Sequence, residues 1–425
     1  NLLDNPDLLP TEDAIVAALG GPGGYPEDAV RESLKTLHKN RRVLFRRGIS
    51  GAFCLWPHTS VDLEAAYDRA TKVIGHIESV GPHLREFLET RPLVARRHYI
   101  QTGNLRYFDV RYSPIGEIEA AAAAPTDADG LIIVALCETK SDCARAEQLA
   151  RSEAIKSRDN VLLAVPTEPL THQAGLVAEA LRWEWVAVNT PELNADRFAR
   201  EEVSRQKMVT RQRLERRMQD LIGLRSLNGA MALKWFRASR ALKINNGRQL
   251  LERISDLCDD IYSEAPHVHN ELVNRRRLSS AAAAARKRLI ERLLSGSNEP
   301  LLGMDSAKKP PEMSIYLSVL LEARIHVKTK DGWTLRVPDP RNDPLKVAPC
   351  LKAIRTFLER HGDRRVKISD IFAHLAKPPY GVREGLAPIF LAVYSALNAQ
   401  EVAFYEDSTF LKEVKGDEFL RICKV

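Results

Sequence analysis

The sequence predicts an α+β protein that is mostly helical, with winged-helix-like units near both ends and a small α/β domain and a long helical region between them. Three stretches, residues 20–56, 308–337 and 377–414, contain a Pro/Gly turn, an apolar helix and a β-hairpin in the same order. Between the first two, apolar runs at residues 131–137 and 161–165 bracket a helical stretch, which is typical of a βαβ unit with a buried parallel sheet.

The first winged-helix-like unit combines two helices with a hairpin. Helices are predicted over residues 11–19, where Thr11 can cap the first turn, and over residues 27–40, which follow Pro26. Short β-prone runs at 42–46 and 52–56 flank a Gly-rich turn. Helix, helix and hairpin follow in the order of a winged-helix unit.

The other two units repeat this order near the C-terminus. The second has helices over 279–294 and 312–323 and a hairpin from 325–328 and 333–337; the third has helices over 368–375 and 386–397 and a hairpin from 402–405 and 410–414. The α/β domain is expected to have strands at 106–111, 131–137, 161–165 and 185–188, and helices at 142–156 and 176–181. Residues 195–294 are predicted to be helical throughout.

These patterns divide the 425-residue chain into four parts. They are a winged-helix-like unit (1–75), a small α/β domain (76–194), a basic helical region (195–300) and two further winged-helix-like units (301–425). No apolar run approaches the roughly 20 residues of a membrane span. The six cysteines form no CxxC pair and are interpreted as reduced thiols. The N-terminus has no pattern of a signal peptide, so a cytoplasmic location is expected. The abrupt start without Met suggests that an upstream part is missing.

The positive charge is regional. The chain has a net charge of +7, but residues 197–292 hold 22 Lys and Arg against 11 Asp and Glu. Basic side chains on helices and hairpins are typical of contacts to nucleic-acid phosphates. We therefore expect a continuous positive surface that binds double-stranded DNA. Its candidate residues are Arg41, Arg42, Arg46 and Arg47 on the first hairpin, Arg275, Arg276, Arg277, Arg286, Lys287 and Arg288 in the helical region, and Lys328 and Lys330 on the second hairpin. The third hairpin, acidic at Glu406 and Asp407, fits DNA poorly.

Motifs of catalysis are missing from the sequence. It contains no phosphate-binding loop, no Gly-x-Ser-x-Gly and no His-Glu-x-x-His, and no cofactor or metal site is expected in this chain. One enzymatic alternative is a nuclease in the α/β domain. Asp109 on one strand, with Glu138 and Lys140 after another, could together hold a divalent ion.

Several strings are similar to those of large ATPases of bacterial phage-defence islands, including the ATP-binding component of BREX-type systems. They are residues 91–99 (RPLVARRHY), 103–108 (GNLRYF), 270–275 (NELVNR) with 278–281 (LSSA), and 378–381 (PPYG). In that family a P-loop ATPase module comes first, and winged-helix, α/β and helical regions follow. The resemblance implies a non-hydrolysing C-terminal portion, with ATP and magnesium bound only by a missing upstream module.

The expected function is therefore the DNA-binding or assembly region of a phage-defence ATPase. Its partners would be duplex DNA and other defence subunits, without a membrane, and self-association into a homo-oligomer is left open. Asn270 and Asn274 are expected to satisfy a buried backbone junction, which leaves the neighbouring arginines free for phosphate. The first alternative is a protein scaffold that binds no nucleic acid, in which the basic stretch matches an acidic surface of a partner subunit. The second is the nuclease.

Overall fold

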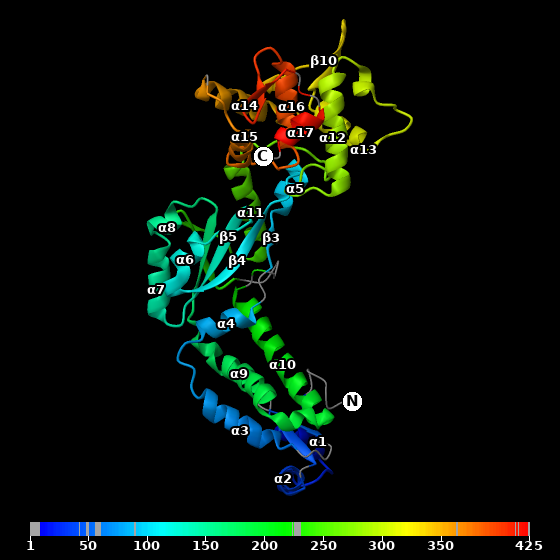
Figure 1. Ribbon diagram of the computed structural model, residues 1–425. Helices are drawn as coiled ribbons and strands as arrows, with labels where there is room; N and C mark the ends of the chain where they lie inside the picture. Colours follow the sequence, from blue (N-terminus) through cyan, green and yellow to red (C-terminus); the bar gives the residue numbers. More distant parts are fainter. Residues whose placement is uncertain are drawn as a thin grey trace.

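The molecule is elongated and consists of three bodies arranged along its length, as Figure 1 shows for this computed structural model. We call them the arm, the sheet domain and the C-terminal domain. The α+β class with mostly helical content is confirmed. The structure describes residues 9–41, 43–47, 51–55, 61–88, 91–222, 224, 231–362, 364–412, 414 and 416–423.

The arm lies at one end of the molecule and contains the first helices and hairpin. Thr11 caps the first helix through its side-chain oxygen, as the sequence predicted. Phe53 on the hairpin packs with Val16, Val30 and Leu34 of the two helices. The elements are α1 (Glu12–Leu19), α2 (Glu27–Lys35) with a π-helical turn (Thr36–Asn40), β1 (Leu44–Arg47), β2 (Ala52–Leu55) and α3 (Leu63–Ile74).

The sheet domain is a six-stranded sheet with helices on both faces. Its strand order is β3-β4-β5-β6-β7-β8. The three central strands are parallel, whereas β3, β7 and β8 are antiparallel to their neighbours, so the sheet is mixed rather than wholly parallel. The strands are β3 (Leu93–Val94), β4 (Tyr107–Pro114), β5 (Gly130–Leu136), β6 (Val161–Pro166), β7 (Leu233–Arg237) and β8 (Arg240–Leu242).

Two predictions for this region were wrong. Residues 185–188, expected as a strand, belong to the helix α9 (Ala174–Asn189), in which Val186 and, in part, Trp185 and Ala187 pack against the arm rather than into the sheet. Residues 195–294 are not helical throughout, because β7 and β8 return to the edge of the sheet. The sheet therefore extends beyond the expected boundary at residue 194.

Helices cover the sheet on both faces. One face is covered by α6 (Ile118–Ala123), α7 (Lys140–Leu149) and α8 (Glu153–Lys156). The other face is covered by α4 (Gly81–Phe87), α11 (Gly247–Ile261) and parts of α9 and α10 (Arg197–Ile222). The helix α5 (Arg96–Thr102) lies at the end of the sheet nearest the C-terminal domain (Figure 1).

The paired helices α9 and α10 join the arm to the sheet domain. Val177 near the start of α9 and Met218 near the end of α10 pack on the sheet. Trp183 later in α9 and Val203 early in α10 pack instead with α3 and the hairpin of the arm. Because each helix contributes to both cores, the arm cannot turn on the sheet domain without bending two long helices.

The C-terminal domain has one large core built around α16. Its helices are α12 (Ser280–Ser295), α13 (Pro311–Ile315) with a π-helical turn (Tyr316–Leu321), α14 (Ala348–His361), α15 (Ile368–Ala376), α16 (Ala387–Leu397) and α17 (Gly416–Ile422). Two hairpins complete it, β9 (His326–Thr329) with β10 (Gly332–Leu335), and β11 (Phe404–Glu406) with β12 (Thr409–Leu411). Each predicted helix and hairpin of this region is present. The winged-helix assignment of the three units stays a prediction.

All six cysteines are free thiols in the structure. Burial raises the pKa of Cys258 to about 12, so this thiol stays protonated at neutral pH. Within the described part of the chain, we find no helix that combines the length and the apolar character needed to cross a bilayer.

Replacing Trp183 by alanine should destabilise the arm. The indole is 1% exposed and packs on the Tyr67 ring, with ring centroids 4.9 Å apart. We expect Trp183→Ala to lower the free energy of unfolding of the arm by about 3–5 kcal/mol, since it leaves a large cavity. Urea denaturation measures this change. Val188→Ala on the same helix, at a side chain that is 77% exposed, is the control and should change the value by less than about 0.5 kcal/mol.

Candidate functional site

The sheet domain and the C-terminal domain meet around one buried carboxylate, that of Asp129, which precedes β5. Arg106, which directly precedes β4, donates to it at 2.9 Å. Arg276 lies 2.9 Å from it and Arg383 3.1 Å, and both come from segments that follow α11 in the chain. The backbone N–H of Tyr107 also donates to it, at 3.2 Å. One anion thus binds three cations from three distant parts of the sequence.

The arginines keep Asp129 ionised. Burial by itself would raise the pKa of this carboxyl, but Arg383, Arg106 and Arg276 together lower it below its usual value. Buried charges of this kind are stable only when paired and hydrogen-bonded. Here each oxygen of the carboxylate has more than one donor, so the pairing is complete.

Arg106 is itself almost fully buried and is held on every side. Its guanidinium lies over the Tyr262 ring, 3.5 Å from the ring centroid. It also donates to the backbone carbonyl of Gly381 at 2.9 Å. A Cβ atom at position 381 would collide with both Arg106 and Tyr262, and the residue has a positive φ of 56°. Glycine is therefore required for the C-terminal domain to approach this closely.

A buried histidine connects this cluster to α11. Arg106 donates from Nε to Nε2 of His98 at 3.2 Å, so the proton of the neutral imidazole is on Nδ1. His98 Nδ1 then donates to Asp259 at 2.6 Å. Burial lowers the pKa of His98, and the charge of Arg106 acts in the same direction against the attraction of Asp259. Asp259 also pairs with Arg97 at 2.6 Å.

Amide side chains complete the junction. Asn274 donates to the carbonyls of Gly103 and Val268, at 3.0 and 2.8 Å, and Asn104 donates to the carbonyl of Pro266 at 2.8 Å. Asn270 donates to the Ser314 carbonyl at 3.2 Å and to Ser318 Oγ at 2.7 Å, and it accepts from the N–H of Leu272 at 2.9 Å. The prediction that Asn270 and Asn274 satisfy a buried backbone junction is confirmed.

The strings that suggested the phage-defence resemblance meet at this junction. Residues 91–99 contribute Arg97 and His98, and residues 103–108 contribute Arg106. Residues 270–275 contribute the two asparagines, and residues 378–381 contribute the Gly381 carbonyl. Four segments, distant in the sequence, thus form one site.

The basic run at 275–288 is largely engaged by the protein's own acceptors. Arg275 pairs with Glu271 at 2.9 Å, and Arg276 belongs to the Asp129 cluster. On α12, Arg288 pairs with the buried Glu312 at 2.8 Å. Arg286 donates to the carbonyls of Glu384 and Gly385, and Lys287 lies 3.7 Å from Glu291. Arg277 is exposed. The expectation that the arginines stay free for phosphate was wrong for Arg276, because the junction needs its donors, whereas it stays a prediction for the exposed Arg277.

The predicted basic residues do not form one surface. Arg41 and Arg46 are exposed on the arm, whereas α12 lies at the opposite end of the molecule (Figure 1). Lys328 and Lys330 are exposed on the β9–β10 hairpin, also in the C-terminal domain. Arg42 and the side chain of Arg47 lie outside the described residues. The expected continuous positive surface is therefore interrupted by the sheet domain.

The residues proposed for a nuclease do not converge. Asp109 lies in register with Leu131 at the beginning of β5, and Glu138 follows seven residues later, so roughly 20 Å of strand separates them. Asp109 accepts from Thr126 at 2.5 Å, and Glu138 accepts from Ser79 at 2.6 Å and from the N–H of Gly81 at 2.9 Å. Lys140 is exposed on α7. The nuclease constellation is therefore contradicted by the topology.

Sequence reasoning did not single out Asp129, His98, Asp259 or Arg383. Asp129 stands in a short acidic loop between a helix and a buried strand, where a carboxylate is usually solvated. Among the described residues, no group of three or more His, Cys, Asp or Glu side chains is arranged to hold a metal ion. What marks the site is therefore a surplus of arginines around one carboxylate.

Removing the Asp129 carboxylate should destabilise the junction strongly. We expect Asp129→Asn to lower the free energy of unfolding by about 3–5 kcal/mol, since three arginines then lack their shared anion. Chemical denaturation followed by circular dichroism measures the change. Asp127→Asn, two residues earlier at an exposed side chain, is the control and should cost less than about 0.5 kcal/mol. Equal effects of the two substitutions would contradict this account.

The junction should also weaken in mild acid. Below a pH of about 6.5 the unfolded chain protonates His98, but the folded chain resists because the pKa of His98 is lowered. As the pH is lowered, this difference should decrease the free energy of unfolding by at most about 1.4 kcal/mol per pH unit. His98→Asn keeps a donor toward Asp259 and should show a flatter profile between pH 7.5 and 5.5. Parallel profiles for both proteins would rule out this role.

Comparison with known proteins identifies no family. No family model matches the chain, and neither a curated protein nor a solved structure shows significant similarity to it. The resemblance to phage-defence ATPases stays a prediction, and the site is defined by its geometry.

Proposed function

We propose that this chain is an assembly scaffold that holds the arm and the C-terminal domain in a fixed relation, so that partner subunits can bind at both ends. The observation that carries the proposal is the buried Asp129 carboxylate with its three arginines. Such a cluster specifies one docking geometry, because any other arrangement leaves a buried charge unpaired.

The second support is the way the arm is attached. The helices α9 and α10 each contribute side chains to the core of the arm and to the core of the sheet domain. The arm is therefore an extension of the sheet domain and not a separate module on a loop. With the Asp129 cluster at the other end of the sheet, the three bodies move as one.

Most of the basic side chains at residues 275–288 already pair with the protein's own carboxylates and carbonyls. This supports a scaffold over duplex binding along the whole molecule. Arg276 and Arg288 are paired with Asp129 and Glu312, two carboxylates that are almost fully buried. A cation that already neutralises a buried carboxylate has little to gain from a phosphate. Membership of a phage-defence system, and with it other defence subunits as partners, is carried into this proposal from the sequence.

Duplex DNA binding by the arm is a second candidate. Arg41 and Arg46 are exposed beside the first hairpin. On α10, which packs against that hairpin, Arg200, Arg211, Arg216 and Arg217 are exposed as well. These side chains could contact phosphates without base readout.

The scaffold is tested by co-expression with the proteins encoded beside this chain. After nuclease treatment, light scattering on a size-exclusion column should show a complex of defined mass. Asp129→Asn should weaken that complex about tenfold or more, because simultaneous binding at both ends depends on their fixed separation. Asp127→Asn is the matched control and should leave the complex intact.

Binding to labelled duplex DNA decides between the two candidates. If no complex with a neighbouring protein forms, and duplex affinity instead falls with salt by a slope of about 0.9 per phosphate, the scaffold is wrong and the arm binds DNA. In that case Arg41→Ala and Arg200→Ala should lower the affinity, whereas Lys330→Ala at the opposite end should not.

A further inference from the structure

The outer face of the β11–β12 hairpin presents two aromatic side chains to solvent. Phe404 faces inward and packs on the buried Phe419, with ring centroids 5.7 Å apart. Because side chains alternate along a strand, Tyr405 and its cross-strand neighbour Phe410 face the other way. Tyr405 is 39% exposed and Phe410 is 54% exposed, and their ring centroids are 5.7 Å apart.

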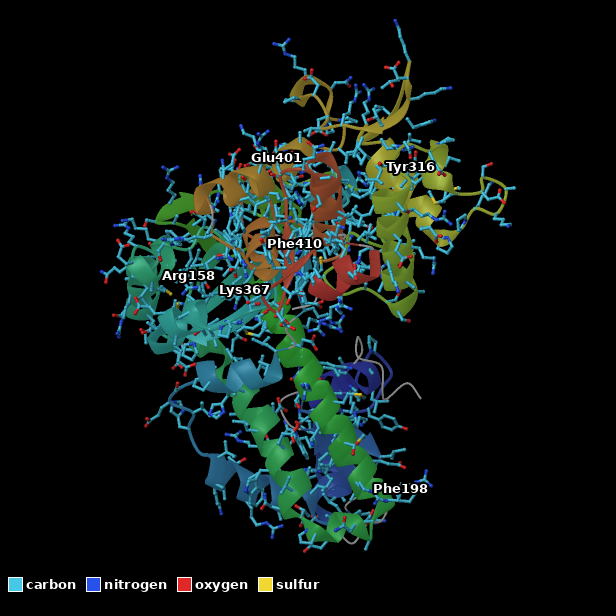
Figure 2. All side chains as sticks on the ribbon, turned by 45° about the horizontal axis from the view of Figure 1, so that its top comes forward. Arg158, Phe198, Tyr316, Lys367, Glu401 and Phe410 are labelled. Atoms are coloured by element: carbon cyan, nitrogen blue, oxygen red, sulfur yellow. The ribbon has the colours of Figure 1, made fainter. Side chains whose placement is uncertain are left out.

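An arginine extends this aromatic surface. The guanidinium of Arg365 lies 3.9 Å from the centroid of the Tyr405 ring. Arg365 also donates to the carbonyl of Ser408 in the hairpin turn, at 3.4 Å. We call Tyr405, Phe410 and Arg365 the aromatic platform. Phe410 and Lys367, two residues after Arg365, can be located in Figure 2.

The charge around the platform is positive. Arg364 and Lys367 are exposed on the segment that carries Arg365. Glu406 is neutralised, because both of its oxygens accept from Arg421 at 2.6 Å and this pairing lowers the pKa of the carboxyl. Of the two acidic residues that made this hairpin a poor fit for DNA, Glu406 therefore adds little negative charge to the platform, which leaves Asp407 at the tip of the turn.

We propose that the aromatic platform binds single-stranded nucleic acid. Exposed rings stack on the faces of bases, and a guanidinium held over a ring offers a further stacking plane. The neighbouring cations supply contacts for phosphates. Base faces are covered in a duplex, so only an unpaired strand can use this surface. The proposal goes beyond the scaffold function and does not depend on it.

Fluorescence anisotropy with a labelled oligo-deoxythymidine of about 12 nucleotides tests the platform on the full chain. Phe410→Ala and Tyr405→Ala should each lower the affinity about ten- to a hundredfold, since one stacking partner is lost. Phe410→Tyr should retain most of the affinity, and Phe410→Leu should not. This pair separates stacking from simple apolar contact.

Two further variants complete the design. Arg365→Ala should lower the affinity and reduce its dependence on salt. Tyr25→Ala removes an aromatic side chain that is 69% exposed on the arm and should leave binding unchanged. Circular dichroism confirms that each variant is folded. Unchanged binding of Phe410→Ala and Tyr405→Ala, or an absence of oligonucleotide binding, would each overturn the proposal. An absence of oligonucleotide binding would favour a protein as the occupant of this face.

Discussion

The arrangement of the three bodies depends on one electrostatic constraint, the buried carboxylate of Asp129 shared among Arg106, Arg276 and Arg383. Taking four charged groups out of water is costly, and the cost is offset only when every charge finds its partners. The C-terminal domain can therefore dock on the sheet domain in one way. Hydrophobic packing alone would tolerate small slips at this interface, but the charge cluster does not.

The groups around this cluster are uncharged or charge-balanced. His98 is held neutral by burial and by the guanidinium of Arg106, and its Nδ1–H donates a hydrogen bond to Asp259. Asn104 and Asn274 satisfy backbone carbonyls that the turn between the domains would otherwise leave without donors. The junction is thus a hydrogen-bonded network in which each member orients the next.

This network changes the meaning of the basic residues. A local surplus of arginine is usually taken as a surface for anions, but at 275–288 most of the donors are directed at the protein's own carboxylates and carbonyls. At the third hairpin, which is acidic in sequence, Glu406 is paired with Arg421, so the aromatic face of the hairpin lies beside exposed cations. In both places the role of a charge is decided by its partner and not by its residue type.

The sequence by itself determined the helices α1, α2, α12, α13, α15 and α16, the three hairpins and the central βα pattern, because these follow from local periodicity, capping residues and turns. It also determined that Asn270 and Asn274 serve a buried turn. Tertiary structure alone decided that residues 185–188 are helical, that β7 and β8 join the sheet, and which cations remain free. These outcomes depend on contacts between residues up to 278 positions apart, such as Arg383 with the Leu105 carbonyl, and no local pattern encodes such contacts.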